Sequence, residues 1–332
     1  MLVSGLDVHK NFCQAIIMTE KGEIVKEAKI RTTREDILNF YSSYPDITIA
    51  MEACYAYEPI YDVLDNAGYK VKLSHPSKTK AIAYAKVKTD RIDAKVLADL
   101  VRSGLLPEAY IPLKEIREMR RLCRERMKMV SERTRIKNRI RHELIRKRIK
   151  SEINLRSKEG MRWLKGLNIP VINRGIEIME KINECIKEID KEIERIAVRY
   201  EEEIRILMSI PGIGRYSACM IISEIGEVDR FEDGEKLTSY AGLAAGIEKS
   251  GNITRYRGIT REGNRYLRWI LIEVVHIHIR IADSGITRLY KRVKEKKAIV
   301  ASARKLCKAI YYMLKRKEEF KGKGGILIVG MR

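Results

Sequence analysis

The sequence predicts an α/β domain followed by a larger all-helical region. Three observations support this fold class. Short apolar strands alternate with helix signals over the first hundred residues, and residues 114–150 contain neither Pro nor Gly. From Ile172 to Leu207, apolar residues recur every three or four positions, which is the spacing of an amphipathic helix. A chain of 332 residues is long enough for two or three domains.

The first hundred residues predict a sheet with helices inserted between its later strands. Thr33 is an N-cap signal followed by acidic first-turn residues, and Gly68 marks the end of a helix. In chain order we expect strands at 2–8, 13–18 and 24–30, a helix at 34–41, a strand at 47–51 that ends on Glu52, a helix at 58–66, a strand at 69–73 and a helix at 90–101. A three-strand meander followed by alternating helix and strand is the order of a ribonuclease-H-like fold.

Two long helices dominate the middle of the chain. The first is basic and spans 114–150, and Gly160, Gly166 and Pro170 interrupt the helical pattern after it. The second carries a near-heptad apolar seam from Ile172 to Leu207, which predicts either an antiparallel helical hairpin or an intermolecular coiled coil. We favour the intermolecular pairing.

The last third predicts a compact, helix-rich domain that closes with a helix at 298–317. The tail from Lys321 is rich in Gly and Lys and is expected to be mobile. The predicted domains are therefore an N-terminal domain at 1–110, a basic helical or coiled-coil region at 111–205, a C-terminal domain at 206–320 and a mobile tail at 321–332.

The charge of the chain indicates a polyanionic partner. It holds 67 Lys and Arg against 45 Asp and Glu, a formal net charge of +22. Residues 1–110 are neutral, whereas residues 111–150 contain 16 basic and 5 acidic side chains, and a second basic block covers 204–332. Two separate basic surfaces suit nucleic-acid binding better than general solubilisation.

Cysteine usage and hydropathy exclude other classes of protein. The six cysteines are scattered without a CxxC pair or a histidine at ligand spacing, which argues against a zinc site and a disulfide framework. We see no signal peptide and no apolar run of the ~18 residues that a membrane helix needs. A cytoplasmic protein without a membrane partner is expected.

Four carboxylates are the candidate catalytic and metal-binding residues: Asp7, Glu52, Asp90 and Asp93. Asp7 and Glu52 end strands that are neighbours in a ribonuclease-H-like sheet, and Asp90 and Asp93 share one face of a helix. Converging carboxylates bind hard cations such as Mg²⁺, with Mn²⁺ able to substitute. Two such ions about 4 Å apart would clamp a phosphoryl transfer. Taken singly, Asp7 could instead be a strand-end residue, Asp90 an N-cap and Asp93 a dipole partner. His9, two residues after Asp7 on the same strand face, could support the metal ligands, although we favour a surface histidine.

The C-terminal third contains candidate phosphate-binding residues. The segment around Gly212, Gly214 and Arg215 resembles the turn of a helix-hairpin-helix motif, although a plain Gly-rich connection would look similar. Ser250 lies in a basic loop and could act as a nucleophile, or it could be an ordinary loop serine. Five arginines follow it and could hold a phosphate: Arg255, Arg257, Arg261, Arg265 and Arg268.

Seven short motifs together resemble one protein family. They are GLDVHK at 5–10, MEAC at 51–54, KTDRIDA at 88–94, IPGIG at 210–214, YAGL at 240–243, KSG at 249–251 and GITREGNRYLRWIL at 258–271. This set is similar to the DEDD-type transposases of prokaryotic insertion sequences, a group of serine-containing, bridge-RNA-guided recombinases. The resemblance covers nearly the whole chain. Members often show Ser-Ser-Gly where this chain has Lys249, Ser250 and Gly251, which leaves the local geometry open.

The resemblance implies a RuvC-like N-terminal domain whose acids bind Mg²⁺ and a C-terminal transposase domain that supplies Ser250. The serine would attack DNA and form a covalent phosphoserine. The implied partners are double-stranded DNA (the element ends and the target), a guide RNA bound by the helical middle, and further copies of the chain in a dimer or tetramer. Acids and serine would meet across protomers.

Two other functions remain open on the sequence. The same acids could serve a Holliday-junction-type or structure-specific endonuclease that uses water as the nucleophile. Alternatively, the chain could be a non-enzymatic nucleic-acid-binding scaffold in which the acids are structural. Ser250 separates the recombinase from the nuclease, because hydrolysis does not require it.

Overall fold

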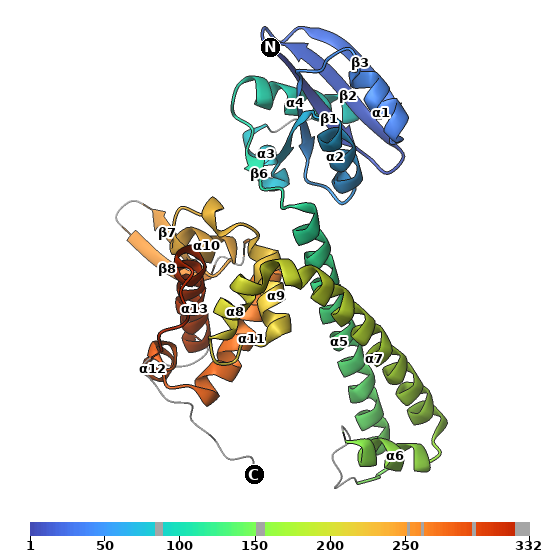
Figure 1. Cartoon of the computed structure of the whole chain (residues 1–332), viewed down its shortest axis with the longest axis vertical. Helices are drawn as coiled ribbons and strands as arrows, with labels where there is room; N and C mark the ends of the chain where they lie inside the picture. The colour runs from blue at the N-terminus through green and yellow to red at the C-terminus, as the bar shows by residue number, and fades with distance from the viewer. Residues whose placement is uncertain (84–88, 151–156, 251–252, 260–261, 294–296, 323–332) are drawn as a thin grey trace. The chain divides into compact units, whose positions relative to one another are not determined.

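The computed structural model divides into two compact units, Met1–Ile111 and Pro112–Arg332 (Figure 1). It describes residues 1–83, 89–150, 157–250, 253–259, 262–293 and 297–322. The predicted boundary between residues 205 and 206, which would divide the second unit into two domains, stays a prediction. Most of the tail expected at 321–332 lies outside the described residues.

A six-stranded sheet forms the centre of the first unit (Figure 1). Its strands are β1 (Leu2–Val8), β2 (Phe12–Thr19), β3 (Ile24–Arg31), β4 (Thr48–Glu52), β5 (Lys70–Ser74) and β6 (Glu108–Ala109). The order is β3-β2-β1-β4-β5-β6, with β1, β2 and β3 antiparallel and β1, β4 and β5 parallel. This is the ribonuclease-H-like arrangement that the sequence predicts. The short strand β6 is an addition that the sequence did not indicate.

Helices cover both faces of the sheet. They are α1 (Arg34–Tyr41), α2 (Tyr57–Asn66), α3 (Pro76–Ile82) and α4 (Asp90–Arg102). Side chains of α1 and α2 share a core with Leu6 and Met51 on one face, whereas α4 packs through Ala94 and Ala98 on the other. The alternation of β1 therefore directs Leu6 to the α1 and α2 layer and Asp7 toward α4.

The contact between α4 and β1 depends on Gly5. A Cβ placed on Gly5 would lie 1.9 Å from the carbonyl oxygen of Ala94 and 2.6 Å from the amide nitrogen of Ala98. Only a residue without a side chain allows the helix backbone to approach the strand this closely. Small residues on both partners thus bring the first turn of α4 near the end of β1.

A helical hairpin opens the second unit and consists of α5 (Lys114–Arg146), α6 (Lys158–Gly166) and α7 (Pro170–Ala197). Helices α5 and α7 run side by side (Figure 1), and their apolar residues pack together, Ile136 and Ile140 against Ile172 and Ile176 among them. The seam of α7 is therefore covered within the chain. Our preference for an intermolecular pairing of this seam was wrong.

The remainder of the second unit is mainly helical. Its elements are η1 (Val198–Tyr200), α8 (Glu201–Met208), α9 (Arg215–Ile225), η2 (Val228–Arg230), α10 (Gly234–Tyr240), β7 (Ala245–Ser250), β8 (Ile253–Ile259), α11 (Arg265–Ile281), α12 (Gly285–Arg292) and α13 (Lys297–Arg316). The single helix expected up to Leu207 is broken by η1. The segment expected to be a loop around Ser250 contains the antiparallel pair β7 and β8. Within the described part of the chain, no helix combines the length and apolar character needed to cross a bilayer.

Replacing Gly5 with alanine should destabilise the first unit. The clash involves backbone atoms of α4, so the free energy of unfolding should fall by about 3 kcal/mol, at the upper end of typical overpacking costs. A thermal melt followed by circular dichroism measures this. Gly166→Ala is the control, because a Cβ there meets nothing within 4 Å. A Gly5→Ala chain that melts like the parent would contradict the close approach.

Candidate functional site

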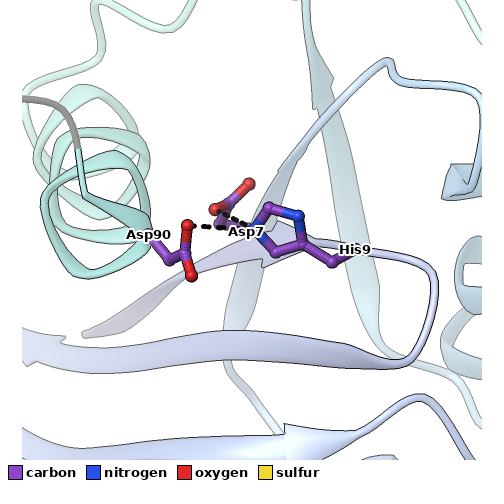
Figure 2. Close-up of side chains that lie close together, drawn as sticks. All are labelled: Asp7, His9 and Asp90. Atoms are coloured by element: carbon purple, nitrogen blue, oxygen red, sulfur yellow. Dashed lines mark hydrogen bonds and ion pairs between the residues drawn. The ribbon is translucent and has the colours of Figure 1, made fainter.

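Three ligand-bearing side chains converge at the end of β1. Asp7 lies on β1, His9 follows this strand, and Asp90 begins α4. The His9 Nε2 atom lies 3.0 Å from an Asp7 carboxylate oxygen and 3.2 Å from an Asp90 carboxylate oxygen (Figure 2). Among the described residues, these three form a group whose ligand atoms all lie within 4.8 Å of one another.

The first turn of α4 is positioned by residues of its own motif. The Thr89 hydroxyl accepts a hydrogen bond from the Ile92 amide and caps the helix. Asp90 is therefore not the N-cap, and the structural explanation considered for it is wrong. Arg91 donates to Glu27 on β3 at 2.6 Å, which ties the start of the helix to the sheet. Asp90 is thereby left to face His9 and Asp7.

Glu52 and Asp93 lie outside this group. Glu52 ends β4, and the parallel register pairs Leu6 with Met51, so the next position along brings Glu52 beside Asp7 on the α4 face. Asp93 lies one turn after Asp90 and contributes to the electrostatics of Asp7. The structure thus places all four carboxylates at one end of the sheet, and it brings Asp7 and Asp90 closest together through His9.

Burial sets the protonation behaviour of Asp7. This side chain is among the buried polar residues, with 8% of its surface exposed. Loss of solvation raises the pKa of its carboxyl group, the positive field of His9 opposes the shift, and the negative fields of Asp93 and Asp90 add to it. A cation in this position would relieve both the burial cost and the repulsion between carboxylates.

The donor set suits a divalent metal ion. Carboxylate oxygens of Asp7 and Asp90 are ligands that Mg²⁺ and Mn²⁺ accept, and an imidazole nitrogen widens the choice toward Mn²⁺ and other transition metals. The His9 side chain is 41% exposed and contacts both aspartates, which fits the supporting role that the sequence left open better than the isolated surface histidine that we favoured. The signal for it was its position two residues after Asp7, which places it on the same face in an extended chain.

The predicted serine and arginines belong to the second unit. Ser250 is the last residue of β7 and pairs with Ile253 of β8, while Gly251 and Arg261 lie outside the described residues. Arg255 and Arg257 are on β8. Arg265 and Arg268 are on α11, and Arg268 donates to the Ala241 carbonyl at 3.1 Å.

The glycine-rich turn between α8 and α9 is shaped by packing. Gly212 has a φ of +98°, and a Cβ there would lie 3.2 Å from the backbone nitrogen of His278 on α11. The buried His278 ring donates from Nδ1 to the Pro211 carbonyl. Gly214 is the N-cap of α9 without a side-chain cap, and Arg215 is engaged by Glu194 and Glu201. Much of the Arg215 charge is thus already neutralised within its own unit.

A buried ion-pair network connects α5 with α9 and α11. The Glu224 carboxylate is fully buried and receives two hydrogen bonds from Arg124, at 2.6 and 2.7 Å. Asn264 donates to the same carboxylate at 2.7 Å, and its own side-chain oxygen caps α11. The asparagine of the GNRYLR run therefore has a structural role, which sequence reasoning did not assign.

Two models of known protein families match segments of this chain. A transposase model of the IS110 DEDD type matches residues 4–147, and a model described as transposase, IS116/IS110/IS902 family, matches residues 204–291. The chain belongs to the IS110/IS116 family of transposases. The two matches cover the converging carboxylates and the segment that carries Ser250.

Individual relatives agree with this family. The transposase for insertion sequence element IS1111A of Coxiella burnetii is 24% identical over 96% of this chain and 91% of its own. A probable family 20 transposase of Pseudomonas aeruginosa is 24% identical over 83% of each chain. Among solved structures, a Thermus thermophilus RuvC bound to a Holliday junction substrate is similar over 33% of this chain and 99% of its own, at 13% identity and a TM-score of 0.26. The fold assignment of the first unit accordingly depends on its strand order.

Replacing Asp7 with asparagine should stabilise the metal-free transposase at neutral pH. Because the folded-state pKa of Asp7 is raised, folding is favoured below the unfolded pKa of about 3.9 and loses stability as the pH rises through the folded value. The Asp7→Asn chain has no carboxyl group to ionise at this position. It should therefore be more stable than the parent at a pH above the folded-state pKa of Asp7, and equally stable below the unfolded pKa of about 3.9. Thermal melts in EDTA across the acidic and neutral range measure the difference.

Asp46→Asn, at an exposed position, provides the control and should show little change. An Asp7→Asn chain that melts below the parent at neutral pH would show that the carboxylate is not under electrostatic strain.

Proposed function

We propose that this transposase cuts and rejoins DNA for an insertion sequence by metal-dependent attack of Ser250 on a DNA phosphate, guided by a bridge RNA. The observation that carries the proposal is the convergence of Asp7 and Asp90 on His9 at the end of β1. A set of carboxylates at the carboxyl ends of neighbouring strands suits phosphoryl transfer. The role of Ser250 as the nucleophile is inferred from the resemblance of its segment to the family.

In this proposal Asp7, Glu52, Asp90 and Asp93 hold Mg²⁺, and Mn²⁺ can take its place. The bound ion would neutralise charge that develops on the phosphate oxygens. Asp7 and Asp90 contribute the closest oxygens, and Glu52 is available from the next strand. His9 either adds a nitrogen ligand or orients the two aspartates through its Nε2–H.

Ser250 supplies the nucleophile in the proposed reaction. Its hydroxyl oxygen bonds to phosphorus and loses its proton, while the bond from phosphorus to the leaving sugar oxygen breaks and that oxygen gains a proton. The product is a phosphoserine joined to one DNA end. Attack by the hydroxyl of another strand reverses these steps and releases the serine, so no net energy input is required.

The basic surfaces would hold the nucleic acids. Residues 111–150 carry 16 basic side chains, most of them on α5, and suit the guide RNA and the backbone of double-stranded DNA at the element ends and target. Arg255, Arg257, Arg261, Arg265 and Arg268 would grip the scissile phosphate, with Gly212, Gly214 and Arg215 as a further backbone contact.

Assembly completes the proposed active site. We infer a homo-oligomer, a dimer or tetramer, in which the carboxylates of one protomer meet Ser250 of another. Since α5 covers the apolar seam of α7, the surfaces that join protomers lie elsewhere on the chain.

Asp90→Asn should abolish DNA cleavage and strand exchange. The loss should exceed the roughly 100-fold effect typical of residues that only orient metal ligands. A plasmid that carries the gene with its flanking DNA supplies the ends and any guide transcript, and amplification across joined ends measures recombination. Asp99→Asn on the same helix is the matched control, because Asp99 pairs with Arg102 away from His9. Full activity of Asp90→Asn in Mg²⁺ would exclude the metal site.

Ser250→Ala should abolish both the covalent protein–DNA adduct and strand exchange. Denaturing gels of labelled DNA incubated with the transposase detect the adduct. Loss of the adduct with cleavage retained would favour hydrolysis by water, as in a structure-specific endonuclease. An adduct that persists in the variant would remove Ser250 from the chemistry.

A further inference from the structure

A cavity of about 460 Å³ opens between α5, α9 and α11. Three aromatic side chains line it: Tyr216 from α9, and Tyr266 and Trp269 from α11. Met127 and Val130 of α5 add apolar surface to the wall. The volume lies within the range of about 300–1,000 Å³ that is usual for ligand sites. None of the side chains that line the cavity is acidic.

Cationic side chains surround this aromatic surface. Arg126 lies over the Tyr216 ring, 4.0 Å from its centroid, and its charge is paired with Asp190. Lys128 and Arg265 are exposed at the same cavity, and within the described residues neither has a carboxylate at ion-pair distance. Two cations that lack an acidic partner are therefore available to an anionic ligand.

The three aromatic rings differ in the contacts that they already make within the chain. Tyr216 donates its hydroxyl hydrogen to the Cys123 carbonyl. The Tyr266 ring has the guanidiniums of Arg124 and Arg265 against it, 4.2 and 4.8 Å from its centroid. Trp269 is 36% exposed and, in the part of the chain that the structure describes, makes no ring or cation contact. Its indole is the ring that a planar ligand can stack on.

We propose that this cavity receives an unpaired nucleobase of a nucleic-acid strand, with Trp269 as the stacking surface and Lys128 and Arg265 as contacts to the flanking phosphates. Aromatic rings beside unpaired cations are the combination that single-stranded nucleic acids require. A base inside a duplex is stacked on both faces and cannot enter, so the strand must be single or locally opened. An apolar segment of a second protein would instead leave both cations without compensation.

The position of the cavity fits this role. Its α5 wall belongs to the most basic segment of the chain, and its α11 wall is the next helix in the chain after β7 and β8, the strand pair that includes Ser250. The inference rests on the nucleic-acid binding in the proposed function, and it is independent of the carboxylates and the serine.

Binding measured in EDTA isolates this site, because no cleavage is needed. The probes are a fluorescein-labelled poly-dT strand, the same strand with abasic positions, poly-U and a blunt duplex, each titrated with the full chain at constant salt. Trp269→Ala should weaken binding of the intact single strand about tenfold, the size typical of losing one base–aromatic stack. It should leave the abasic strand and the duplex unchanged.

Lys128→Gln should weaken the intact and abasic strands alike, since it removes a phosphate contact. Lys187→Gln, an exposed lysine on α7 outside the cavity, is the matched control. A larger Trp269→Ala effect on poly-U than on poly-dT would identify RNA as the source of the base, and the reverse would identify DNA. Equal weakening of duplex and single strand by Trp269→Ala, or no weakening, would overturn the proposal.

A second measurement leaves Trp269 in place. The chain has two tryptophans, so Trp163→Phe makes Trp269 the single indole reporter. Its fluorescence should be quenched by the intact strand and not by the abasic strand. Equal responses to the two strands would also overturn the base-binding role.

Discussion

The close approach of α4 to β1 is the contact on which the candidate active site depends. Gly5 leaves room for the backbone of α4 at Ala94 and Ala98, and no other residue could do so. The contact places the first turn of the helix beside the end of the strand, so Asp90 can reach His9 and Asp7. A packing requirement between backbones therefore determines the spacing of the ligand atoms.

The same arrangement imposes an electrostatic cost that the rest of the unit must offset. Asp7 is buried next to other carboxylates, and its raised pKa records the unfavourable energy of its charge. The Thr89 cap, the Arg91–Glu27 pair and the apolar contacts of Val3 with α4 keep the helix in place despite that repulsion. Strain of this kind is expected where a protein preorganises a binding site for a cation.

Much of the first unit was predictable, because its strands and helices follow simple periodicities and its motif places Asp90 and Asp93 on one helix face. The sequence places His9 on the same strand face as Asp7 but does not show that it contacts both aspartates, because alternation gives a side chain's direction and not its partners. The seam of α7 shows that a partner is needed but not which helix supplies it, although Ile136, Ile140 and Leu144 of α5 recur every four residues. The β7 and β8 strands were missed because their charged composition resembles a loop.

In the second unit, residues at the start of α11 make several distinct polar contacts. Asn264 caps α11 and donates to Glu224, while Arg124 brings α5 to the same carboxylate. A buried ion pair of this type is costly to break, because removal of one partner leaves an uncompensated buried charge. It therefore sets α5 and α11 in one alignment, which shapes the cavity at Trp269 between them. The basic helix α5 and the helix α11 are thus coupled by polar contacts to one carboxylate, that of Glu224.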